Sequence, residues 1–215
     1  MSAGLRSEVL TSAGERVLRA TGSFCRELGF YLGGGTALAL HLGHRRSIDF
    51  DWFSEGERFD PDEIRGSLAR HGIDFSVRDL GRGALHGSIE GVLVSFLRYR
   101  YPLLSRPDFL EPFGCVRASL EDLACMKLAA AAQRGSKKDF FDVAAVCKSA
   151  VPLERALRLY GQKYDLDDVG HVVISLAFFD EADSEPDPML LESPGWFEVK
   201  RWLTSEVRRL SSIHR

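Results

Sequence analysis

The sequence predicts an α+β fold, with a mixed β-sheet and flanking helices in the N-terminal half and a helical bundle after it. Short segments of alternating apolar and polar residues, typical of strands, are concentrated before residue 100. Beyond Pro102, apolar residues recur at the three- and four-residue spacing of helices. No apolar run approaches the roughly 18–20 residues that span a bilayer. We therefore expect two domains, 1–104 and 105–215, in a cytoplasmic protein with no membrane partner.

The N-terminal elements are predicted in order along the chain. Residues 5–28 predict a helix from the spacing of their apolar positions. Residues 30–32 predict a short strand that the glycines 33–35 end, and residues 36–42 predict a helix directly after these glycines. Residues 47–53 predict a strand, because its acidic residues would lie on one face and its apolar residues on the other.

The middle of the chain predicts one more helix and a meander. Asp60 and Pro61 begin the helix, because aspartate caps a first turn and proline fits the first helical position. Gly72 ends it after about His71. Glu90-Gly91 fits a tight turn. The three antiparallel strands expected here cover residues 74–80, 83–89 and 92–99. The helices expected later cover residues 120–133, 137–149, 153–163, 167–182 and 195–211, with an exposed connector at 183–195.

The composition of the chain argues against two classes of function, non-specific nucleic-acid binding and zinc binding. The 215 residues are 45% hydrophobic and 27% charged, as in ordinary globular proteins. A formal net charge of −3 argues against non-specific coating of nucleic acid. The four cysteines show no Cys-x-x-Cys spacing, so we expect buried thiols and no zinc site.

The most informative motif is the pair Asp49 and Asp51. On a strand, residues two apart share a face, so both carboxylates would meet at one point. Two carboxylates at one point repel each other unless a cation lies between them. Mg²⁺, or Mn²⁺, takes oxygen ligands of this kind together with phosphate oxygens. The alternative is that both are surface acids on a half-exposed strand.

Two neighbouring segments favour phosphate binding. The glycines that include Gly34 and Gly35 allow close backbone approach, and the next helix would point N–H groups and the Thr36 hydroxyl at an anion. Arg46 follows in a basic segment and would contact phosphate. Ser47 would face the same side as Asp49 and contact phosphate or order the site. The alternatives are a plain turn and a solvated basic loop.

A second cluster lies in the helical half. Lys127 interrupts an apolar run, which places it either at the surface or against an anion. Arg134 is about two helical turns further on and shares its face. Asp139 and Asp142 are three residues apart on the next helix. The alternative is a helical hairpin with ordinary ion pairs.

Together, the two patterns resemble the AbiEii/MenT group of nucleotidyltransferase-like proteins, in the polymerase-β-like superfamily, over residues 28–150. The resemblance implies a nucleotidyltransferase-like N-terminal sheet and a helical domain that completes the nucleotide cleft. It also implies a metal-dependent enzyme. The roles that it implies are phosphate binding for Gly34, Gly35 and Thr36, metal binding for Asp49 and Asp51, triphosphate contact for Lys127, and positioning of base, substrate or lysine for Asp139 and Asp142.

One position departs from this resemblance. Superfamily members often carry a third carboxylate on a later strand, where this chain has Ser95. The nearest acid is Glu90, in the turn. Either Asp142 takes over this role, or the protein binds nucleotide without turnover.

We therefore expect transfer of a nucleoside monophosphate from an NTP to an RNA end, such as that of tRNA, or to a protein hydroxyl. The resemblance implies the toxin of a toxin–antitoxin or abortive-infection system, with a cognate antitoxin as partner. The main alternative is a catalytically degenerate, NTP-binding regulatory module, and a weaker one is a kinase-like phosphotransferase.

Overall fold

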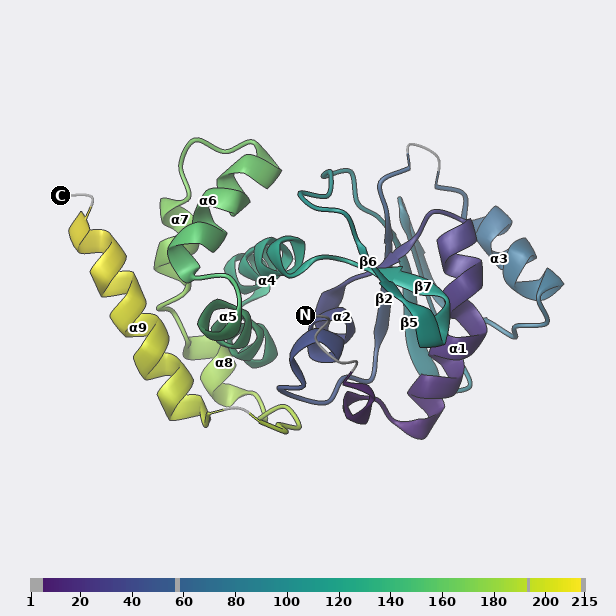
Figure 1. Cartoon of the computed structure of the whole chain (residues 1–215), viewed down its shortest axis with the longest axis horizontal. Coiled ribbons are helices and arrows are strands. Elements are labelled where there is room, and N and C mark those ends of the chain that lie inside the picture. The colour runs from purple at the N-terminus through teal and green to yellow at the C-terminus, as the bar shows by residue number, and fades with distance from the viewer. Residues whose placement is uncertain (1–5, 57–58, 193, 214–215) are drawn as a thin grey trace. The chain divides into compact units, whose positions relative to one another are not determined.

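The computed structural model describes residues 6–56, 59–192 and 194–213 and contains two compact units (Figure 1). The first, called the sheet unit, comprises Met1–His41 and Ser47–Ser119. The second, called the helical unit, comprises Leu42–Arg46 and Leu120–Arg215. The predicted division after residue 104 differs from this one, because two further strands follow that residue.

The sheet unit is built on a seven-stranded mixed sheet in the order β3-β4-β5-β2-β1-β7-β6. Its strands are β1 Tyr31–Leu32, β2 Phe50–Ser54, β3 Ser76–Gly81, β4 Ala84–Ile89, β5 Val92–Arg98, β6 Asp108–Leu110 and β7 Cys115–Arg117. Strands β3, β4 and β5 form the predicted antiparallel meander. Strand β2 pairs with β5 in parallel and with β1 in antiparallel orientation.

The two faces of this sheet differ in burial. Phe50, Trp52 and Phe96 are at most 1% exposed and form the core on one face. Helices α1 (Ser12–Glu27) and α3 (Pro61–Arg70) lie on one side of the central strands, and α2 (Gly34–Leu42) lies on the other (Figure 1). The α1 side is the Phe50 face, because a Cβ atom on Gly14 of α1 would lie 3.6 Å from the Phe50 ring. The α2 side is therefore the face of Asp51.

Local chemistry explains where these helices begin. The Thr11 hydroxyl accepts a hydrogen bond from the Gly14 N–H at 3.0 Å and caps α1. The Asp60 carboxylate accepts from the N–H groups of Asp62 and Glu63, at 2.9 and 3.3 Å, as the predicted cap of α3. The predicted cap and first-turn proline are confirmed.

The helical unit contains α4 Leu120–Arg134, α5 Lys137–Ser149, α6 Leu153–Tyr164, α7 Gly170–Ser175, α8 Asp180–Ser184 and α9 Trp196–Ile213. Helix α4 packs against α5, α6 and α7, and α5 packs against α9. All four cysteines are buried and reduced, as predicted. Within the described ranges, no helix combines the length and apolar character needed to cross a bilayer.

Several element predictions were wrong in detail. The helix predicted at 5–28 begins only at Ser12, after a short 3₁₀ turn, and the strand predicted at 47–53 begins at Phe50. Strands β6 and β7 were not predicted, because three residues are too few for an alternation signal. The helix predicted at 167–182 is two short helices, α7 and α8.

Candidate functional site

The glycine turn lies directly against the Asp51 carboxylate. The Gly33 N–H donates to the Asp51 carbonyl at 2.9 Å. Gly34, the first residue of α2, has φ +64°, and a Cβ atom there would lie 2.5 Å from Asp51 Oδ2. Only glycine satisfies both conditions without strain. The structure therefore brings the predicted phosphate turn, with Gly35 in its first helical turn, to the predicted metal-binding acid.

Two hydroxyl groups hold the segment that leads into β2. Thr36 Oγ1 lies 2.8 Å from Ser47 Oγ and also hydrogen-bonds to the Asp49 carbonyl. Thr36 is 1% exposed and Ser47 is 9% exposed. The Ser47 N–H donates to the Val9 carbonyl at 3.1 Å. Both side chains therefore position Asp49 through internal hydrogen bonds.

The two acids fit a hard divalent cation. Asp51 lies on β2, and Asp49 directly precedes this strand. Asp49 Oδ1 is buried and has no hydrogen-bond partner among the described residues. A buried carboxylate oxygen without a partner is costly, and a cation or a ligand donor would satisfy it. Within the described part of the chain, no three His, Cys, Asp or Glu residues are arranged to hold a metal.

Ser95 and His86 extend the row that begins at Asp51. In the register of the strands, Asp51 of β2 pairs with Ser95 of β5, and Ser95 pairs with His86 of β4. Ser95 thus lies beside Asp51, where the resemblance implies a third carboxylate. His86 Nδ1 lies 3.0 Å from Ser95 Oγ. His86 was missed by the sequence analysis, although the predicted turn at Glu90-Gly91 already pairs residues 86 and 95.

The second predicted cluster forms a buried ion network in the helical unit. Lys127 on α4 places Nζ 2.7 Å from Asp142 Oδ2 and 3.2 Å from Asp139 Oδ1. Arg134 donates to Asp139 at 2.6 Å. Both carboxylate side chains are 0% exposed, and Lys127 is 4% exposed. The structure thus brings these four residues together across α4 and α5.

Two residues before β2 complete this network. Arg45 donates to both Asp142 oxygens, at 2.7 and 2.8 Å, and His44 Nε2 lies 2.8 Å from Asp142 Oδ1. Burial alone would raise the pKa of Asp142. The charges of Lys127 and Arg45, with the hydrogen bonds from Arg45 and His44, hold this pKa well below its usual value. Asp142 therefore stays ionised, and its carboxylate orients cations within the network.

Arg46 lies in the same segment with its side chain exposed. Its N–H donates to the Met189 carbonyl at 2.8 Å, and its carbonyl accepts from Arg45 at 2.9 Å. The predicted site residues thus form two groups. Gly34, Gly35, Thr36, Ser47, Asp49 and Asp51 belong to the sheet unit, and Arg46, Lys127, Asp139 and Asp142 belong to the helical unit.

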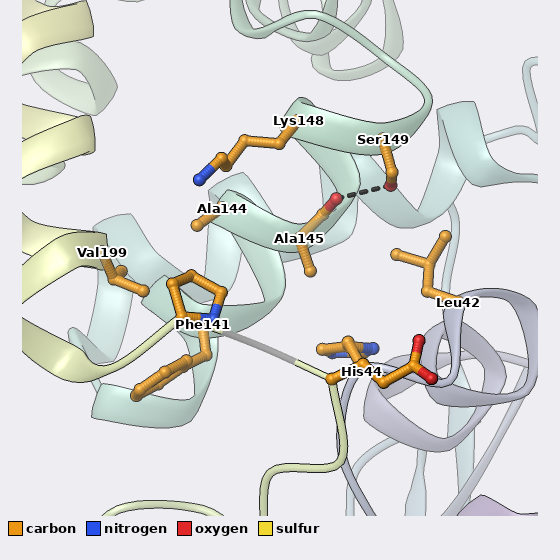
Figure 2. A pocket seen from close by; sticks show the side chains of 10 residues that line it. Leu42, His44, Phe141, Ala144, Ala145, Lys148, Ser149 and Val199 are labelled. Carbon is orange, nitrogen blue, oxygen red and sulfur yellow. Dashed lines mark hydrogen bonds between the residues drawn. The ribbon is translucent and has the colours of Figure 1, made fainter.

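A pocket of about 220 Å³ lies in the helical unit (Figure 2). Phe141, Ala144 and Val199 give it an apolar wall, and the imidazole of His44 borders it. Ser149 Oγ donates to the Ala145 carbonyl at its rim, at 2.6 Å. None of the predicted site residues is among the described residues that line it. We therefore do not assign nucleotide binding to this pocket.

Sequence comparison identifies a relative of the chain. No model of a known protein family matches it. The uncharacterized protein aq_aa25 of Aquifex aeolicus (strain VF5) is 38% identical over 183 residues, which are 83% of this chain and 86% of that protein. This chain belongs to the aq_aa25 family.

Solved structures show which fold this member of the aq_aa25 family has. MenT4, a nucleotidyltransferase toxin of Mycobacterium tuberculosis H37Rv, aligns with a TM-score of 0.60 and 15% identity, over 91% of this chain and 82% of MenT4. JHP933 of Helicobacter pylori aligns with a TM-score of 0.58 and 17% identity, over 96% and 100%. ANT(2")-Ia, solved in complex with adenylyl-2"-tobramycin, aligns with a TM-score of 0.53 and 18% identity, over 74% and 98%.

These likenesses confirm the predicted fold class, a nucleotidyltransferase-like α+β fold followed by C-terminal helices. At such low identity they establish the fold alone. The narrower assignment of this aq_aa25-family member to the AbiEii/MenT group stays a prediction.

Proposed function

We propose that this protein is a metal-dependent nucleotidyltransferase. It transfers a nucleoside monophosphate from an NTP to an RNA end, such as that of tRNA, or to a protein hydroxyl, and releases pyrophosphate. The observation that carries the proposal is the contact of the Gly34 turn with Asp51, at the start of a helix in a nucleotidyltransferase-like fold. This contact joins a phosphate-binding backbone to an acid pair that fits a divalent cation.

Each residue of the sheet unit has a role in this proposal. The first N–H groups of α2, at Gly34 and Gly35, bind phosphate oxygens. Thr36 and Ser47 hold the backbone that carries Asp49. Asp49 and Asp51 would hold Mg²⁺ or Mn²⁺, and such an ion, when bound, offsets the charge of the triphosphate and of the leaving pyrophosphate.

The cationic side chains to which we assign phosphate contact belong to the helical unit. Asp139 and Asp142 both accept hydrogen bonds from the Lys127 ammonium group, at 3.2 and 2.7 Å. We assign triphosphate contact to Lys127, positioning of Lys127 to Asp139 and Asp142, and phosphate contact to the exposed side chain of Arg46.

The decisive experiment uses NTPs labelled at the α- or the γ-phosphate, with Mg²⁺ and either total tRNA or a cell lysate. We expect one or more α-labelled NTPs to label RNA or protein. The Asp49→Ala/Asp51→Ala variant should lose this transfer, whereas the exposed-acid control Asp62→Ala/Asp74→Ala should keep it. Equal transfer by both double variants would contradict the assignment of Asp49 and Asp51 as metal ligands. Transfer of the γ-label would indicate a kinase.

The toxin role belongs to the same proposal. It is supported by the likeness to MenT4, which is named a toxin. The test is growth of a bacterial host that expresses the wild-type chain or its Asp49→Ala/Asp51→Ala variant. Growth arrest by the wild type alone would support the role, and equal growth of both would contradict it.

A second candidate function is an NTP-binding regulatory module without turnover. The specific observation that favours it is Ser95, which occupies the strand position beside Asp51. Calorimetry would then detect NTP binding, while no RNA or protein acceptor becomes labelled.

A further inference from the structure

A row of three polar side chains crosses the sheet next to the glycine turn. Asp51, Ser95 and His86 are register partners on the neighbouring strands β2, β5 and β4. Register partners project to the same side of a sheet, so all three lie on one face. Each of them is half-buried, whereas their chain neighbours Trp52, Phe96 and Leu85, on the opposite face, are fully buried. The row therefore lies on the face at which the Gly34 turn meets Asp51.

The hydrogen bond between His86 and Ser95 determines what the imidazole can do. His86 Nδ1 lies 3.0 Å from Ser95 Oγ, so the imidazole leans toward Ser95 on β5. When Nδ1–H donates to the hydroxyl, the neutral ring presents the lone pair of Nε2 as an acceptor. A histidine held in this way by a neighbouring group is oriented to act as a general base.

We propose that His86 is the general base of nucleotidyl transfer and that Ser95 is its positioning residue. This inference rests on the function proposed above. The proton of the acceptor hydroxyl moves to His86 Nε2, and the oxygen electron pair forms a bond to the α-phosphorus. The bond from this phosphorus to the bridging oxygen of pyrophosphate breaks, and its electron pair leaves with pyrophosphate. The imidazolium then returns its proton to solvent.

The acids that could stand in for a third carboxylate have other partners. Glu90 is held at the turn by Arg16, with Nη2 and Oε2 2.9 Å apart. Asp79 of β3 is the register partner of His86 on the side away from Asp51, and its carboxylate accepts from the Leu80 N–H at 2.9 Å. Asp142, which the sequence analysis offered as the replacement carboxylate, is 0% exposed and bound by Lys127 and Arg45. His86 is therefore the best-placed group to accept the proton.

The first test compares His86→Gln with His171→Gln, which makes the same change at an exposed position of the helical unit. We expect His86→Gln to lower kcat by about 100-fold or more, with NTP affinity by calorimetry unchanged, and His171→Gln to match the wild type. If the wild type labels no acceptor, the proposed function fails. If the wild type labels an acceptor and His86→Gln does so at the same rate, only the present inference fails.

The pH dependence of transfer provides a second readout. Wild-type transfer should decrease at acidic pH, because an Nε2 that already holds a proton cannot accept one from the acceptor hydroxyl. This decrease at acidic pH should be absent in His86→Gln. The charged groups in register on either side of His86, Asp79 and Asp51, are present in both proteins and do not account for the difference. If His86→Gln shows the same decrease at acidic pH as the wild type, His86 is not the general base.

Two further variants separate a chemical role from a structural one. In the His86→Gln background, Ser95→Asp places a carboxylate beside Asp51. This double variant should transfer the nucleotide at least tenfold faster than His86→Gln alone. A double variant no faster than His86→Gln overturns the base assignment.

Independently of activity, ¹⁵N spectra of neutral His86 should show the Nδ1–H tautomer in the wild type and a shift toward Nε2–H in Ser95→Ala. An Nε2–H tautomer in the wild type also overturns it.

Discussion

Two glycines of the sheet unit share a backbone conformation but have different surroundings. Gly34 has φ +64° and Gly29 has φ +76°. A Cβ atom on Gly34 would lie 2.5 Å from Asp51 Oδ2, whereas one on Gly29 would meet nothing within 4 Å. Alanine at either position therefore introduces similar backbone strain, of about 1–3 kcal/mol, but only Gly34→Ala also displaces the Asp51 carboxylate.

We therefore predict that Gly34→Ala abolishes NTP binding and transfer, whereas Gly29→Ala is destabilised but binds normally. Calorimetry with Mg²⁺ and each NTP measures binding, and urea unfolding measures the free energy of unfolding. Gly34→Ala with wild-type affinity would show that this turn does not hold the phosphates. Equal loss of affinity in both variants would assign the effect to strain alone.

His41 at the end of α2 is predicted to make stability depend on pH. Burial and the nearby Arg117 lower its pKa from 6.5 to about 4, and its Nε2–H donates to the Ala118 carbonyl at 3.0 Å. The pKa is lower in the folded state, so the unfolded chain binds the proton more readily between these values. The stabilisation is therefore complete above about pH 6.5 and is lost as the pH falls toward 4.

The expected loss from this residue is about 2 kcal/mol between about pH 7 and pH 5. It is measured as the difference between wild type and His41→Gln in the free energy of unfolding at the two values, since other groups titrate in both proteins. Parallel pH curves for the two proteins would mean that His41 is not held neutral in the folded state.

At the scale of elements, helix α4 takes part in two buried lysine–aspartate pairs, with its lysine in one and its aspartate in the other. Lys127 on α4 lies 2.7 Å from Asp142 of α5, and Lys163 on α6 lies 2.7 Å from Asp122 of α4. Both aspartate side chains are 0% exposed. Removing one partner of such a pair leaves a buried charge and costs about 3–5 kcal/mol.

Lys127→Met and Lys163→Met should therefore destabilise the protein to a similar degree, but only Lys127→Met should abolish nucleotidyl transfer. The comparison is made at a temperature at which both variants are folded by circular dichroism. If the two variants lose activity in proportion to their stability, Lys127 serves the fold rather than the triphosphate.

Elements formed by interactions between residues close in sequence were predicted, whereas those that depend on distant residues were not. The cap at Asp60 and the turn at Glu90-Gly91 depend on residues within a few positions, and both were predicted. The break between α7 and α8 has no glycine or proline, and there Phe179 packs its ring 5.1 Å from Phe140 and 5.6 Å from Trp196. Such tertiary contacts leave no local signal, and the same holds for the pairing of β7 with β1.

At the scale of the whole molecule, contacts within the candidate site were predictable where residue chemistry and sequence spacing point to the same ligand. Gly34 and Asp51 lie seventeen positions apart and were matched because a glycine turn and an acid pair suggest one ligand. The contacts of His86 with Ser95 and of Arg45 with Asp142 were not predicted, because they depend on side-chain direction across strands and on helix packing. The metal, the nucleotide and the acceptor stay predictions.

The charge of the whole chain bears on how an RNA acceptor would be held. The sequence has 28 basic and 31 acidic residues, a formal net charge of −3 and a pI of about 6.1. At neutral pH the chain as a whole therefore repels a polyphosphate, and its affinity for RNA must come from few local contacts. Few phosphate contacts release few counterions, which makes binding weakly dependent on salt.

We predict that affinity for total tRNA falls by about tenfold or less between about 50 and 200 mM salt, as expected for about two phosphate contacts. Filter binding of wild-type protein with labelled tRNA measures this slope. A loss of about 1,000-fold over the same range would instead indicate six or more phosphate contacts and a basic surface concealed by the net charge. Even two phosphate contacts should give detectable tRNA binding at the lower salt concentration. If no tRNA affinity is measurable at either concentration, while a protein in the lysate becomes labelled, RNA is not the acceptor.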